Sequence, residues 1–200
     1  MQLLTVCGSL QARSANRAAL DVVHAHARAA GADIDEFDAL AAIPPLDPDA
    51  GDDPGVVVDD WRARIARADA VVIASPEYAG AVAGVVKNAL DWIVGSGELY
   101  TKPVGLITAG TSGGYHARAA LVQTLTWQGA HVVASLGIDA PRTKIAADGR
   151  FADVATLAVL REFADRMVGA SALTPDDRLG LVYGIVEAAS VEPGHVAPLT

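Results

Sequence analysis

Residues 8–16, Gly-Ser-Leu-Gln-Ala-Arg-Ser-Ala-Asn, gather hydrogen-bond donors without a single acid. They follow an apolar run, residues 3–7, and precede a helix-like segment that begins near Arg17. A loop that enters a helix N-terminus offers free backbone N–H groups and a favourable dipole to an anion. The segment therefore indicates either a phosphate-type site or a simple helix cap at Ser14, and on its own it favours neither.

The donors of this segment are mostly neutral. It contains neither the Gly-Lys-Ser/Thr of a Walker A loop nor Gly-x-Gly-x-x-Gly. Neutral donors come from Ser9, Ser14 and Asn16, and further donors from Gln11 and Arg13. An anion here would be bound by backbone and hydroxyl groups, without a phosphate-binding lysine.

Two more segments suited to a ligand follow later apolar runs. Residues 75–84 contain the stiff Pro76, the flat ring of Tyr78 and two glycines. Residues 110–114, Gly-Thr-Ser-Gly-Gly, leave the backbone open to a ligand. Each segment also fits a plain strand-to-helix connection.

The segment 110–114 also matches Gly-x-Ser-x-Gly, the nucleophile elbow of α/β-hydrolases, with Ser112 as the nucleophile. That chemistry requires a later Asp and then a His, which leaves Asp139 or Asp153 with His195 in the C-terminal tail. Because an elbow would leave the other two segments unexplained, the hydrolase is the weaker hypothesis.

The order of apolar patterns predicts the elements that position these segments. Continuous apolar runs predict buried parallel strands at residues 3–7, 70–74, 104–109 and 132–136, and a mixed run predicts an edge strand at 32–37. Between these runs, apolar residues recur at helical spacing and predict helices. We therefore predict an α/β fold with a five-stranded parallel sheet in the order 2-1-3-4-5. Ligands bind such folds beyond the C-terminal strand ends, where the three segments lie.

Residues 171–200 fall outside this alternation. Thr174-Pro175-Asp176-Asp177 is a helix start, with a cap, a proline and first-turn acids, and the helix should run to about Ala189. We predict one domain over 1–170, followed by a C-terminal helical extension and tail over 171–200.

Composition narrows the class of protein. The chain is 52% hydrophobic with a net charge of −9 and no Lys/Arg stripe, which argues against nucleic-acid binding. No apolar run reaches bilayer length, no signal peptide is expected, and the lone cysteine, Cys7, fits a reducing compartment. We expect a cytoplasmic protein without a membrane partner or a metal site.

Two motifs resemble the NADPH-dependent FMN reductase family, flavodoxin-like proteins that include azo-dye, quinone and chromate reductases. Residues 8–17 look like the family's G-S-L-R-x-x-S-x-N-R loop, and residues 75–92 look like S-P-E-Y-N-x-S-x-P-G-x-L-K-N-A-I-D-W. The resemblance covers roughly residues 1–170. The departures are Gln11 in place of arginine, and Ala79, Ala81 and Ala83 in place of Asn, Ser and Pro.

The resemblance implies a flavodoxin-like three-layer sandwich that binds FMN. It implies that the FMN phosphate is held by Ser9, Gln11, Ser14 and Asn16, that Pro76, Glu77 and Tyr78 lie along the isoalloxazine, and that Ser112, Gly113 and Gly114 line its other side. NADPH or NADH would reduce FMN at N5, so we name no acid–base residue. The acceptor would be a quinone, an azo compound or a free flavin.

Several alternatives stay open. The chain could be a flavodoxin-like electron carrier without NAD(P)H turnover, whereas a phospho-receiver is excluded because residues 7–9 supply no acid. The family implies a homodimer or homotetramer, with Val82–Trp92 facing a partner unless Trp92 packs within its own subunit. Arg118 either meets the nicotinamide phosphates or is a solvated surface arginine, and we favour the surface.

Gln11 yields a prediction. Replacing Gln11 with arginine should tighten FMN binding, because a cation would then stand where most relatives have one. Fluorescence titration of FMN into the wild type and Gln11→Arg measures the change. Equal affinities would place residue 11 away from the phosphate.

Overall fold

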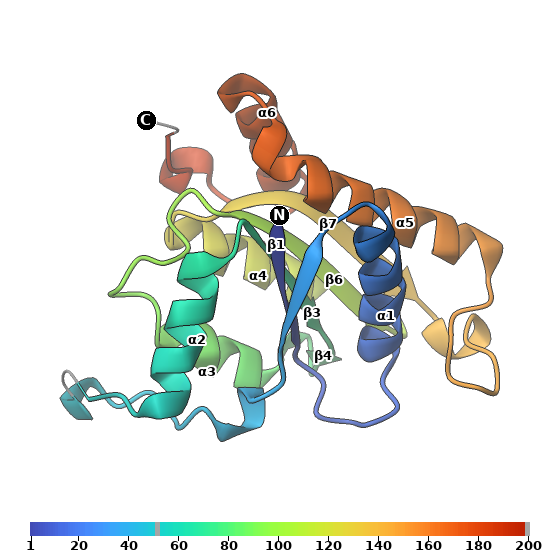
Figure 1. Cartoon of the computed structure of the whole chain (residues 1–200), viewed down its shortest axis with the longest axis horizontal. Coiled ribbons are helices and arrows are strands. Elements are labelled where there is room, and N and C mark those ends of the chain that lie inside the picture. The colour runs from blue at the N-terminus through green and yellow to red at the C-terminus, as the bar shows by residue number, and fades with distance from the viewer. Residues whose placement is uncertain (51–52, 199–200) are drawn as a thin grey trace.

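The computed structural model describes residues 1–50 and 53–198. Its centre is a parallel sheet of five strands in the order β2-β1-β3-β6-β7 (Figure 1). The strands are β1 Gln2–Cys7, β2 Asp33–Phe37, β3 Ala70–Ser75, β6 Pro103–Gly110 and β7 His131–Asp139. Counted along the chain, this is the predicted order 2-1-3-4-5, so the flavodoxin-like α/β fold is confirmed.

Helices cover both faces of the sheet. The helices are α1 Ala15–Ala29, α2 Val56–Arg67, α3 Gly84–Asp91, α4 Tyr115–Trp127, α5 Val154–Gly169 and α6 Pro175–Ala188. Short 3-10 turns span Leu40–Ala42, Pro48–Ala50, Pro141–Thr143, Ala170–Ala172 and Pro193–His195. α1 and α5 pack together on one face, and α2, α3 and α4 lie on the other, which gives three layers (Figure 1).

The burial of each strand follows its sequence. β3 is buried along its whole length because both faces of the sheet are covered there. β2 is an edge strand, and its acids pair with basic side chains. Asp35 Oδ1 lies 2.6 Å from Arg64 Nη1, and Glu36 pairs with Arg17. The prediction of a charged edge strand is confirmed.

The segment after β3 is more ordered than a plain loop. It contains an antiparallel hairpin, β4 Glu77–Tyr78 and β5 Ala81–Val82. The turn residues Ala79 (φ 52°) and Gly80 (φ 71°) are both left-handed, the backbone that a two-residue type I′ turn requires. The sequence did not predict this hairpin, because alanine is disfavoured in that conformation and gives no turn signal.

The C-terminal helix starts where the sequence predicts. Asp177 N donates to Thr174 Oγ1 at 3.2 Å, which confirms the cap of α6. α6 packs against β7 and buries Val182 and Val186 (Figure 1). Within residues 1–50 and 53–198, no helix is long and apolar enough to cross a membrane.

Buried His24 makes the fold sensitive to acid. His24 Nε2 lies 2.9 Å from Thr5 Oγ1, and burial lowers the pKa of His24 to about 4. The pKa of a histidine in an unfolded chain is about 6.5. As the pH falls below that value, the unfolded state takes up a proton at His24 that the folded state does not. Stability should therefore fall by about 2–3 kcal/mol between pH 7.5 and 4.5.

Urea denaturation at both pH values measures this loss. The His24→Gln variant is the control, because it keeps a polar partner for Thr5 and removes the titrating group. Its stability should change less than that of the wild type over the same interval. An equal change in both proteins would contradict the assignment to His24.

Candidate functional site

Three loops meet at the carboxyl edge of the sheet. We call residues 8–14 the first loop, 76–83 the second loop and 110–114 the third loop. They leave β1, β3 and β6, which are neighbours in the sheet, so parallel pairing brings them together. The structure thus places at one edge the three segments that the sequence singled out.

Gly8 lets the first loop lie close to β3 and α3. Gly8 N donates to Ala74 O at 2.7 Å, and a Cβ on Gly8 would lie 2.3 Å from Val86 Cγ2 of α3. A larger residue would push the loop away from β3 and α3.

The first loop uses two of its predicted donors to hold itself in place. Ser14 Oγ accepts hydrogen bonds from Asn16 N (3.1 Å) and Arg17 N (3.5 Å), so Ser14 caps α1. Buried Asn16 accepts from Ala109 N at 3.0 Å and donates to Ala109 O at 3.4 Å. Both side chains already have protein partners, and phosphate contacts from them stay a prediction.

Other donors of this loop remain free. The backbone N–H groups of Leu10, Ala12 and Arg13 donate to none of the residues that the structure describes. Ser9 Oγ only accepts, from Gln11 N at 3.4 Å, so its proton can be donated. Together with the N-terminus of α1, this donor set fits a phosphate group.

The remaining two side chains of the loop differ. Gln11 is exposed, whereas Arg13 Nη2 donates to Ala147 O at 2.9 Å. Arg13 is thus tied to the segment before α5, and Gln11 is free to meet a ligand.

A side chain of the second loop caps α4, the helix that follows the third loop. Glu77 Oε2 accepts a hydrogen bond from Ala117 N at 2.8 Å, in the first turn of α4. The residue at the N-cap of α4 is Gly114, which has no side chain, so Glu77 supplies the missing acceptor. Pro76 is buried and Tyr78 is 59% exposed, which leaves the tyrosine ring open to a ligand.

The third loop depends on its glycines. Gly113 and Gly114 have φ of 73° and 66°, and a Cβ on Gly114 would lie 2.6 Å from Thr108 Cβ. Thr108 Oγ1 donates to Gly113 O at 2.6 Å. The N–H groups of Thr111, Ser112 and Gly114 donate to no residue in the described part of the chain, so they can face a ligand.

Arg118 fixes the position of the third loop through hydrogen bonds. Its Nη1 donates to Thr108 Oγ1 (2.9 Å) and Gly113 O (2.8 Å), and burial lowers its pKa. The interpretation of a solvated surface arginine was wrong, because the side chain is half-buried. The available sequence signal was Gly137 inside a strand, where a Cβ would lie 2.3 Å from Arg118 Nη1.

The structure excludes the hydrolase alternative. His195 stacks on Trp127, with ring centroids 3.9 Å apart, at the C-terminal end of α4. Ser112 precedes the N-terminus of this 13-residue helix, about 20 Å away. Asp139 pairs with Lys144 and Asp153 caps α5, so neither acid serves a triad.

The family model for NADPH-dependent FMN reductase matches residues 1–140. The chain belongs to this family. It is 34% identical over 132 residues to a quinone reductase of Escherichia coli (strain K12), which covers 61% of this chain and 70% of that protein. It is 42% identical over 65 residues to the NAD(P)H-dependent FMN reductase ntnL of a Nectria species. That match covers 32% of this chain and 31% of that protein.

The fold is also similar to that of a solved flavoenzyme. FerB, a flavoenzyme NAD(P)H:(acceptor) oxidoreductase from Paracoccus denitrificans, is similar with a TM-score of 0.73 and 27% identity, over 86% of this chain and 97% of that one. As a member of the FMN reductase family, the protein is an oxidoreductase with FMN as cofactor and a nicotinamide as electron donor.

One family motif packs inside the subunit. Trp92 is 5% exposed, and its Nε1 donates to Pro44 O at 2.8 Å. Asn88 donates to the same carbonyl at 2.8 Å and accepts from Leu46 N at 2.8 Å. The motif holds the segment after β2 in place, so Trp92 packs within its own subunit, the alternative that the sequence left open.

Glu77 can be tested separately from any ligand. Glu77→Ala should lower the free energy of unfolding by about 1–2 kcal/mol, because Ala117 N loses its acceptor and α4 loses its cap. Urea denaturation of the FMN-free protein measures the change. Glu77→Gln keeps an acceptor and should lose less, and an unchanged stability of Glu77→Ala would contradict the capping role.

Proposed function

We propose that the protein passes electrons from NADPH or NADH through bound FMN to a quinone, an azo compound or a free flavin. The observation that carries the proposal is the convergence of free backbone donors from the first and third loops at one sheet edge. The acceptor class is supported by relatives named quinone reductase and 2-hydroxy-1,4-benzoquinone reductase.

The first loop would hold the FMN phosphate through its free N–H groups and the Ser9 hydroxyl. Gln11 is exposed beside them and can add a neutral donor. Ser14 and Asn16 would act mainly by fixing the loop, since both already have protein partners.

The other two loops would flank the isoalloxazine. Pro76, Glu77 and Tyr78 would contact it largely through their main chain, and Ser112, Gly113 and Gly114 would line the other side. FMN supplies hydride acceptance at N5 and onward electron transfer when bound. The protein orients the ring, and free N–H groups of the third loop stabilise negative charge on it because Thr108 and Arg118 hold them in place.

We also propose that the protein is a cytoplasmic homodimer or homotetramer. Tyr78 and Tyr115, 59% and 48% exposed beside the site, are better candidates for the contact than buried Trp92.

Anaerobic reduction tests the function. FMN added to the purified protein should bind, and its absorption should bleach on mixing with NADPH or NADH. A protein that ignores FMN would contradict the proposal, and FMN binding without bleaching would indicate an electron carrier instead.

A matched pair of glycine variants locates the cofactor in the same experiment. Gly114→Ala should weaken FMN binding about tenfold, because alanine there is strained and meets Thr108. Gly180→Ala, on α6 with nothing within 4 Å of its added Cβ, should bind FMN like the wild type. Equal FMN affinity in both variants would place the flavin away from the third loop.

A further inference from the structure

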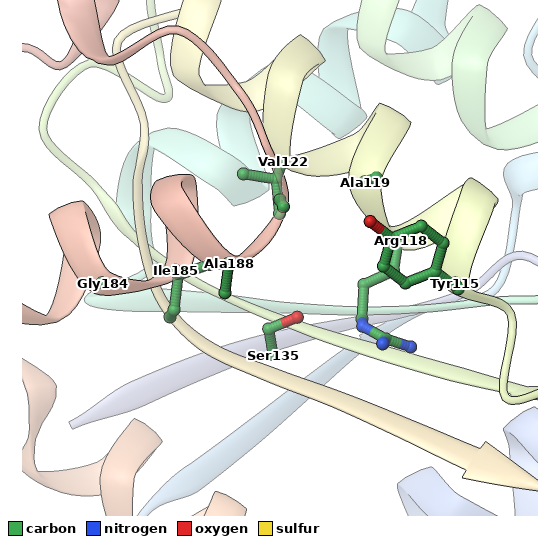
Figure 2. Close-up of a pocket in the computed structure, with 9 residues that line it drawn as sticks. Tyr115, Arg118, Ala119, Val122, Ser135, Gly184, Ile185 and Ala188 are labelled. Atoms are coloured by element: carbon green, nitrogen blue, oxygen red, sulfur yellow. The ribbon is translucent and has the colours of Figure 1, made fainter.

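A pocket of about 200 Å³ lies between α4, β7 and α6, outside the three loops assigned to FMN (Figure 2). Its walls include Tyr115, Arg118 and Val122 of α4, Ser135 of β7, and Ile185 and Ala188 of α6. One wall thus comes from the C-terminal extension, to which neither the family match nor the proposed function gives a role.

Arg118 is the charged side chain of this pocket, and no acid of the described residues lines it. Its Nη1 is used by Thr108 and Gly113, but Nε and Nη2 donate to no residue within the described ranges. The nearby carboxylate of Glu77 already accepts from Ala117 N. The pocket therefore contains a half-buried cation with one side of its guanidinium unused.

The rest of the lining is weakly polar. The hydroxyls of Tyr115 and Ser135 are its other polar side-chain groups, and Figure 2 shows the Ser135 hydroxyl on the same side of the pocket as the guanidinium. Val122, Ile185 and Ala188 supply apolar surface. The volume is below the roughly 300–1,000 Å³ of drug-sized sites, so the fitting ligand has a single ring or a short chain.

We propose that this pocket binds a small carboxylate with an apolar body, such as a single-ring aromatic acid. The carboxylate pairs with Nε and Nη2 of Arg118, because a guanidinium edge matches two carboxylate oxygens. The body packs against Val122, Ile185 and Ala188. A free phosphate fits less well, since one cation among apolar walls leaves most of its oxygens without donors.

Binding here would act on the third loop. The guanidinium that meets the carboxylate also holds Gly113 O at 2.8 Å through Nη1. A ligand bound to Arg118 would therefore contact the same side chain that holds the third loop, the segment proposed to line the flavin. This coupling, unlike the binding itself, rests on the proposed function.

Nuclear magnetic resonance of the whole 200-residue chain with benzoate as the probe tests the site. Amides of Ser135, Gly184 and Ala188 should shift saturably in the FMN-free and the FMN-loaded protein. Benzamide, which has the same ring without the charge, should bind at least about tenfold more weakly. Equal binding of benzoate and benzamide, or tighter binding of inorganic phosphate, would overturn the proposal.

Two alanine variants make the test specific to the pocket. Ala188→Leu fills the pocket from an exposed helix position and should weaken benzoate binding at least about tenfold. Ala158→Leu, at an exposed position of α5 outside the pocket, should bind benzoate like the wild type. Unchanged binding in Ala188→Leu would refute the assignment. Since the FMN-free protein is included, failure here leaves the test of FMN binding and reduction untouched.

Discussion

The side-chain amide of Asn16 joins two segments that are 93 residues apart in the sequence. It pairs with both the N–H and the C=O of Ala109, one residue beyond the last pair of β3 and β6, Ser75 and Thr108. Buried polar groups must be paired, and an orphaned N–H there would cost about 1–3 kcal/mol. The position of the first loop relative to the third depends on this amide.

A second set of contacts begins one residue earlier in β6. Thr108 donates to Gly113 O and accepts from Arg118, and Glu77 binds the first turn of the helix that carries Arg118. In the first and third loops, side-chain hydrogen bonds fix the position of the loop, and several backbone N–H groups have no partner among the described residues. Under the proposed function, this arrangement would let loops with mostly neutral side chains bind a phosphate and a flavin, because oriented N–H groups create a fixed positive potential.

The sequence predicted what local patterns encode. Four uninterrupted apolar runs and one mixed, charged run predicted the five strands of the sheet, and their alternation with helices predicted the strand order. Thr174 predicted the start of α6. The hairpin 77–82 was missed because its turn contains Ala79 in a conformation that alanine rarely adopts. The partners of Asn16, Glu77 and Arg118 could not be predicted, since each lies on another element and is chosen only when the layers pack. Trp92 shows the same limit, because an apolar helix face fits an inner or an outer surface equally well.

The two edges of the sheet are protected in different ways. β2 carries acids engaged by Arg17 and Arg64, and β7 has α6 packed against it (Figure 1). An incoming strand would have to break ion pairs at one edge and displace a helix at the other. Two copies of the chain therefore cannot readily merge into one continuous sheet, and any assembly must form through helices and loops. The helix α6, which lines the pocket, therefore also protects the β7 edge from pairing with strands of other chains.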